Sequence, residues 1–111
     1  MAIIAYLDID QGSDFNTIME LETDQSTPID LTQCQVYSQF RKSYGSTTAY
    51  TFDASIIDAP GGKLKLSLSG EVSSSIRPGR YLYDVEIVSS VSKTRVVEGI
   101  LTINPEITKI P

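Results

Sequence analysis

Hydrophobic and polar residues alternate along almost the whole chain, and this period of two restricts it to an all-β fold. The clearest run is residues 63–68, KLKLSL, in which leucine occupies every second position. Residues 81–87, YLYDVEI, alternate in the same way. Successive side chains of a strand point to opposite faces, so each run predicts a strand with one buried face and one outward face.

About seven such runs follow one another, separated by turn signals such as Pro60-Gly61-Gly62. The predicted strands lie at approximately residues 3–10, 15–22, 34–41, 50–56, 63–68, 81–87 and 94–103. Short strands at this spacing are typical of two packed sheets. The sequence therefore predicts an all-β, antiparallel two-sheet Ig-like sandwich of about seven strands. We expect one domain over residues 1–106 and a short C-terminal tail over residues 107–111.

Two stretches depart from simple alternation. Residues 71–76 predict one short helical turn that crosses between the sheets. In the last strand, the pairs Val96-Val97 and Ile100-Leu101 place apolar side chains on both faces. Either a strand buried on both sides or a β-bulge near Gly99 would produce that pattern.

The amino-acid composition of the chain limits the classes of function that it can have. The chain has 111 residues and a net charge of −5, so we expect neither a nucleic-acid partner nor an anionic membrane partner. Its single cysteine, Cys34, excludes an internal disulfide, and the absence of histidine excludes His-based triads and His-ligated metal sites. The N-terminus is too short and too acidic for a signal peptide, and no apolar run is long enough to span a membrane. We expect a soluble protein made in a reducing cytoplasm.

Gly79 and Tyr81 open the sixth predicted strand, directly after the loop that crosses between sheets. This is the arrangement of a tyrosine corner, in which the Tyr hydroxyl donates a hydrogen bond to the backbone of the preceding loop. The alternative is an ordinary core tyrosine, and the pattern leaves both interpretations open.

Carboxylates are candidates for acid–base chemistry only where they are partly buried. Asp84 and Glu86 alternate with an apolar face, so we expect them to point outward, whereas Glu98 is flanked by apolar residues and is the carboxylate that we most expect to be partly buried. The arginines available to pair with Glu98 or Asp84 are Arg77, Arg80 and Arg95. We interpret this set as a structural cross-strand ion pair. The chain also lacks a nucleophile–base pair and a glycine-rich phosphate loop, so we expect no catalysis and no cofactor.

The acidic segment Asp8-x-Asp10-x-Gly12-x-Asp14 invites a calcium interpretation, because Ca²⁺ prefers clustered carboxylates on a tight loop. The segment departs from the EF-hand pattern, since Met19 stands where the bidentate glutamate belongs. A solvated acidic face is the favoured interpretation, and the sequence assigns no metal site.

Short basic spots at residues 41–42, 63–65 and 77–80 lack the interleaved aromatic residues of a nucleic-acid platform. Solvated strand faces and protection of sheet edges explain them best, and docking of an acidic partner surface is the second interpretation. Tyr6, Tyr37 and Tyr44 are expected to be exposed, and exposed aromatic side chains favour contacts with other proteins.

Four segments in order resemble the small β-sandwich structural proteins of tailed bacteriophages, including the N-terminal domains of some baseplate and receptor-binding components. They are residues 24–32 (DQSTPIDLT), 36–42 (VYSQFRK), 78–87 (PGRYLYDVEI) and 96–108 (VVEGILTINPEIT). The resemblance covers roughly residues 12–108.

The resemblance implies a non-catalytic component of the virion, made in the host cytoplasm. Its expected partners are other virion proteins, with a homo-oligomer or symmetric assembly built through surface complementarity and an exposed sheet edge. It does not distinguish head, neck and tail. The alternative is a host-surface or carbohydrate-binding module, against which the absence of tryptophan counts.

Overall fold

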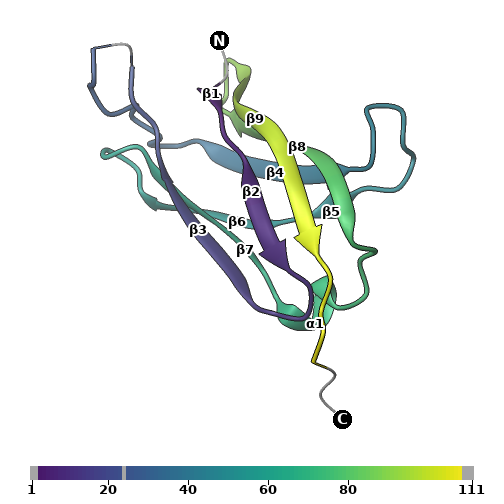
Figure 1. The fold of residues 1–111 in the computed structure, drawn as a ribbon. Helices are drawn as coiled ribbons and strands as arrows, with labels where there is room; N and C mark the ends of the chain where they lie inside the picture. The colour runs from purple at the N-terminus through teal and green to yellow at the C-terminus, as the bar shows by residue number, and fades with distance from the viewer. Residues whose placement is uncertain (1–2, 24, 109–111) are drawn as a thin grey trace.

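The computed structural model describes residues 3–23 and 25–108, which form two β-sheets packed face to face (Figure 1). Sheet A contains β1 (Ile3–Ile4), β2 (Leu7–Asp10), β4 (Gln35–Arg41), β5 (Tyr50–Thr51), β8 (Gly79–Val88) and β9 (Lys93–Asn104). Sheet B contains β3 (Phe15–Glu20), β6 (Asp53–Asp58) and β7 (Lys63–Leu68), and the short helix α1 (Gly70–Ser73) follows β7. The predicted two-sheet Ig-like sandwich is confirmed.

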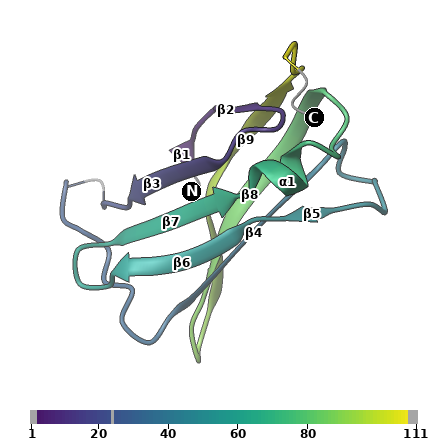
Figure 2. The same cartoon turned by 90° about the horizontal axis from the view of Figure 1, so that it is seen from below.

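The strand order is β1-β9-β8-β4-β5 in sheet A and β3-β7-β6 in sheet B. The chain changes sheets after β2, β3, β5 and β7, and the segment containing α1 makes the last crossing (Figure 2). Most neighbours are antiparallel, whereas β1 and β2 both run parallel to β9 at the edge of sheet A. The long hairpin of β8 and β9 therefore lies at the centre of sheet A, between the first strands and β4.

Alternation determines which side chains form the core. Every second residue of β7 and of β8 is buried, as the sequence predicts. The fully buried Phe40 stacks on Tyr50 and meets Tyr81 edge-on, with ring centroids 5.2 and 5.5 Å apart. Burying each large apolar side chain of this kind stabilises the fold by about 1.5–3 kcal/mol, so the shared core between the sheets is the main source of stability.

The described residues form nine strands rather than about seven, because two predicted strands each divide in two. The first divides at residues 5–6 into β1 and β2. The fourth divides at the buried Phe52, so that β5 belongs to sheet A and β6 to sheet B. Alternation continues unbroken through Phe52 because the inner faces of both sheets meet the same core, so the pattern does not reveal the change of sheet.

The β-bulge of the last strand lies at Val96, three residues before the predicted position. Val85 pairs with Val97, but the next residue of β8, Glu86, pairs with Arg95. Val96 is thus the extra residue, and it directs Arg95 to the outer face of the sheet beside Asp84. The bulge explains the adjacent apolar side chains of Val96 and Val97, because both of them pack toward the core.

The helical turn is shorter than predicted and begins earlier, at Gly70. Ser69 caps it, since its hydroxyl accepts a hydrogen bond from the Val72 amide at 3.2 Å. The fully buried Ser73 accepts a hydrogen bond from the Gly12 amide at 3.0 Å, which fastens the β2–β3 turn to the helix. No helix among the described residues is long and apolar enough to cross a membrane.

Candidate functional site

Gly79 and Tyr81 form the predicted tyrosine corner. The Tyr81 hydroxyl donates a hydrogen bond to the Arg77 carbonyl at 2.5 Å, and Gly79 has a φ of +139°, which a residue with a side chain rarely adopts. Burial raises the pKa of the Tyr81 phenol above its usual value. The exposed Arg80 lies between them on the outward side of β8, and the Lys42 ammonium lies over the Tyr81 ring at 4.9 Å from its centroid. These residues fix the start of β8.

A second buried tyrosine fixes the break between β1 and β2. The Tyr83 hydroxyl donates a hydrogen bond to the Ala5 carbonyl at 2.7 Å, and burial raises the pKa of Tyr83 to about 12. Gly99 lies against the same carbonyl, where an added Cβ would overlap with the Ala5 oxygen. The close approach brings Ile4 and Tyr6 to the edge of the outer face of sheet A.

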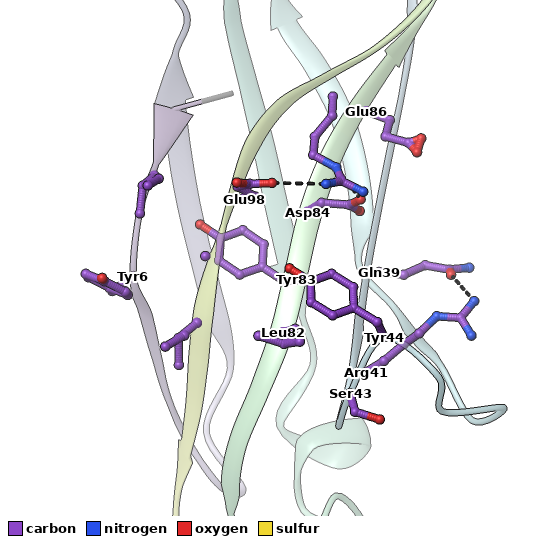
Figure 3. Close-up of a pocket in the computed structure, with 14 residues that line it drawn as sticks. Tyr6, Gln39, Arg41, Ser43, Tyr44, Leu82, Tyr83, Asp84, Glu86 and Glu98 are labelled. Carbon is purple, nitrogen blue, oxygen red and sulfur yellow. Dashed lines mark hydrogen bonds and ion pairs between the residues drawn. The ribbon is translucent and has the colours of Figure 1, made fainter. Parts of the chain in front are cut away.

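That outer face is hollowed. A shallow groove of about 460 Å³ crosses β9, β8 and β4, and we call it the sheet A groove (Figure 3). Its apolar part consists of Ile4, Leu82 and Ile100, and Tyr6 and Tyr44 border it. In Figure 3, Tyr6 lies on one side of the strands and the Tyr44 ring reaches over them from the opposite side. The register places Leu82 directly opposite Ile100.

An ion network lies beside the apolar part of the groove. The Arg95 guanidinium contacts Asp84 Oδ2 at 3.1 Å from Nε, and Glu98 Oε2 at 3.0 Å from Nη1. The predicted cross-strand ion pair is therefore present, with Arg95 as its cation. Within residues 3–23 and 25–108, neither Arg77 nor Arg80 forms an ion pair.

Glu98 is partly buried, as predicted. Its side chain is 39% exposed, and those of Asp84 and Glu86 are shielded more, at 29% and 25% exposed. Asp84 and Glu86 lie on β8, between β4 and β9, whereas Glu98 lies on β9 beside the short edge strand β1. Burial raises the pKa of Asp84 above its usual value, and the nearby charge of Glu86 raises it further while Arg95 partly opposes both.

The acidic segment of residues 8–14 has structural contacts. Asp14 Oδ1 accepts a hydrogen bond from the Gly70 amide at 2.7 Å, and Asp10 Oδ1 accepts one from the Asn104 side chain at 3.3 Å. In the part of the chain that the structure describes, no three acidic or cysteine side chains lie close enough together to hold a metal ion. Asp14 thus joins the β2–β3 turn to α1.

Tyr6, Tyr37 and Tyr44 are exposed as predicted, by 72%, 55% and 81%. The sequence did not predict that they belong to the same face. Tyr37 projects from β4 opposite Glu86, on the outward side of sheet A. Their grouping depends on the order of strands far apart in sequence. Alternation along the sequence places Tyr37 and Leu82 on the outward faces of their predicted strands. It indicates that they share one face only once β4 and β8 are known to pair.

Comparisons with known proteins concern the fold alone. No family model matches the chain, and no curated protein sequence matches it. Among solved structures, InlP from Listeria monocytogenes is 15% identical, with 90% of this chain and 26% of that chain covered and a TM-score of 0.49. A structure that addresses Dscam isoform specificity is 14% identical, with 93% and 23% covered and a TM-score of 0.41. The chain spans about a quarter of the length of each.

Proposed function

We propose that this chain is a non-catalytic assembly protein of a tailed-phage virion, and that it binds other virion proteins through the sheet A groove. The observation that carries the proposal is the grouping of exposed tyrosines around a hollow with an apolar floor. Aromatic side chains beside a partly desolvated apolar patch are typical of the centres of protein interfaces. The four phage-like segments supply the particle context.

The polar groups of the groove favour binding over catalysis. Asp84 and Glu98 are held by Arg95, and the Ser43 hydroxyl lies 3.0 Å from the Ser46 hydroxyl. A catalytic serine needs a base within hydrogen-bond reach, and another serine hydroxyl does not serve as one. The groove is open and shallow, which suits a protein surface better than a reaction that must exclude water.

Quantification of the chain in purified particles tests the proposal. We expect a fixed number of copies per particle that is unchanged through successive gradient purifications. Sedimentation of the purified chain, alone and mixed with isolated head or tail proteins, then identifies the partner. Recovery of the chain from infected-cell lysate only, with none in particles, would contradict the assembly role.

A host-surface or carbohydrate-binding module is the second candidate. It is favoured by the polar side chains of Gln39, Arg41 and Asp84, which line the same groove as Tyr6 and Tyr44, because sugars are bound by hydrogen-bonding groups next to aromatic faces. A glycan array discriminates the two candidates. Binding to defined glycans that is lost in a Tyr6→Ser, Tyr44→Ser variant supports this candidate, and silence on the array with normal incorporation into particles excludes it.

A further inference from the structure

The charge distribution of the groove specifies what its partner must carry. We propose that the sheet A groove binds a protein segment that presents a lysine or arginine side chain between apolar neighbours. This inference rests on the proposed function, because it names the chemistry of the partner that the same groove would bind.

The carboxylates of the groove outnumber the cations that face them. Arg95 is shared between Asp84 and Glu98, so a single guanidinium balances two carboxylates. The third carboxylate, Glu86, has only the Lys93 ammonium at 3.6 Å, and that side chain is 71% exposed. The centre of the groove therefore carries excess negative charge.

The remaining cation of the groove is already engaged. Arg41 Nη1 donates a hydrogen bond to the Ser46 carbonyl at 2.7 Å, and Arg41 Nη2 donates one to Gln39 Oε1 at 3.4 Å. One bond reaches the loop after β4 and the other a neighbouring side chain of β4 itself. Arg41 is thus held at β4, and among the described residues it forms no ion pair with the carboxylates on β8 and β9.

A partner that covers the groove removes water from these carboxylates. The exposed fractions of the three side chains lie between 25% and 39%. Binding would remove the water from these exposed parts. Removing water from a carboxylate is strongly unfavourable unless a cation replaces it. An acidic partner would increase this penalty, and a second copy of the chain packed face to face would bring three carboxylates with only the two guanidinium groups of Arg41 and Arg95 in its own groove.

The raised pKa of Asp84 agrees with this view, since burial and the charge of Glu86 outweigh the effect of Arg95. A cation placed beside Asp84 and Glu86 would reverse that balance. Tyr44 lines the same groove as Asp84 and Glu86, and aromatic faces attract cations.

The apolar neighbours of the cation follow from the register. Leu82 pairs with Ile100, and two residues along the same strands Asp84 pairs with Glu98. An apolar row and an acidic row therefore lie side by side across β8 and β9. An extended segment that alternates apolar and basic side chains can contact both rows at once, with the aliphatic stem of lysine or arginine along the boundary.

Two defined peptides test the inference on the isotope-labelled chain by NMR. The cationic probe is acetyl-leucine-lysine-leucine-arginine-leucine-amide, and the acidic probe replaces both basic residues with glutamate. We expect the cationic peptide to shift the backbone amides of Asp84, Glu86 and Ile100 and to bind roughly tenfold more tightly than the acidic one.

The chain offers a closely matched pair of variants. Glu86 and Glu20 each contact one lysine at 3.6 Å, on the outer faces of sheets A and B respectively. Glu86→Gln should weaken binding of the cationic peptide by about threefold to tenfold, whereas Glu20→Gln should leave it unchanged. Asp84→Asn, with the thermal melt as a check on folding, should have an effect at least as large as that of Glu86→Gln.

Equal binding of both peptides, equal effects of Glu86→Gln and Glu20→Gln, or shifts confined to other surfaces would overturn the inference. A concentration-dependent dimer that protects the same amides would overturn it in favour of a second copy. The proposed function is judged separately by particle incorporation. Suppose that Glu86→Gln enters particles normally and that a Tyr6→Ser, Tyr44→Ser variant does not. The groove then binds a virion protein that contributes no cationic side chain, so this inference fails and the proposed function stands.

Discussion

The outer faces of the two sheets follow the same alternation but present different surfaces. On sheet B the outward pairs are polar or mixed, with Asn16 beside Ser67 and Ile18 beside Lys65. On sheet A two apolar side chains, Leu82 and Ile100, lie beside each other. The inner faces determine the fold and are alike in both sheets. The outer faces are free to diverge, and the proposed function rests on that difference.

Their charges differ in the same way. On sheet B, Glu20 lies 3.6 Å from Lys63, so one carboxylate has one cation. On sheet A, Asp84 and Glu98 share Arg95. Opposite charges paired one to one in water are typical of a solvated surface. A shared cation in a partly shielded groove leaves a charge that a partner can neutralise.

The most disruptive test removes the close approach that shapes the edge of sheet A. Gly99→Ala places a Cβ against the Ala5 carbonyl, which displaces β1 and disturbs the Tyr83 hydrogen bond. We expect the free energy of unfolding to fall by about 2–3 kcal/mol. Urea denaturation measures it. Gly45→Ala is the control, since its Cβ enters open space and should change stability by less than about 0.5 kcal/mol. Equal effects would contradict the account.

The tyrosine corner tests how sheet A is joined to the crossing segment. Tyr81→Phe leaves the Arg77 carbonyl without its donor, so we expect a loss of about 1–2 kcal/mol in the free energy of unfolding. Tyr37→Phe removes an exposed hydroxyl that donates only to the Gln35 side chain, and its effect should be close to zero. Thermal unfolding of the two variants side by side checks the difference.

Breaking the ion pairs on the outer faces of the two sheets should give a smaller difference in the free energy of unfolding. Arg95→Gln leaves two carboxylates without their cation and should cost about 0.5–1 kcal/mol. Lys63→Gln breaks one exposed pair on sheet B and should cost less than about 0.5 kcal/mol. Denaturation at low and high salt measures both. If Lys63→Gln proves the more costly change, the shared cation is not the distinguishing feature of sheet A.

The smallest expected effect is a pH dependence from Asp84. Its pKa is raised above the ordinary 3.8, so the folded state keeps this proton after the unfolded state has lost it. The contribution of Asp84 to stability is therefore greatest below pH 3.8 and declines as the pH rises through the folded pKa. The side chain in Asp84→Asn does not titrate, so the stability of the wild type relative to this variant should fall as the pH rises above 3.8. A difference that rises with pH would contradict the shift.

The sequence predicts the inner faces well because a period of two identifies them locally. Leu64 and Val85, for example, lie in the core as expected. It predicts Tyr81 and Gly79 because their spacing from the crossing loop is also local. The division of the fourth predicted strand at Phe52 could not be predicted, because both sheets bury that residue in the same core. The groove could not be predicted either, because its formation depends on which strands, distant in sequence, pair with each other.

The most direct test of the central claim compares two exposed hydrophobic side chains from each face. Tyr6→Ser, Tyr44→Ser alters the sheet A groove, and Ile18→Ser, Ile57→Ser alters sheet B at side chains that are 59% and 48% exposed. Each variant competes with the wild type for incorporation into particles. We predict that the tyrosine variant is depleted by about tenfold or more while the isoleucine variant is incorporated normally. Equal incorporation of both, or depletion of the isoleucine variant alone, would contradict the assignment of the sheet A groove as the binding face.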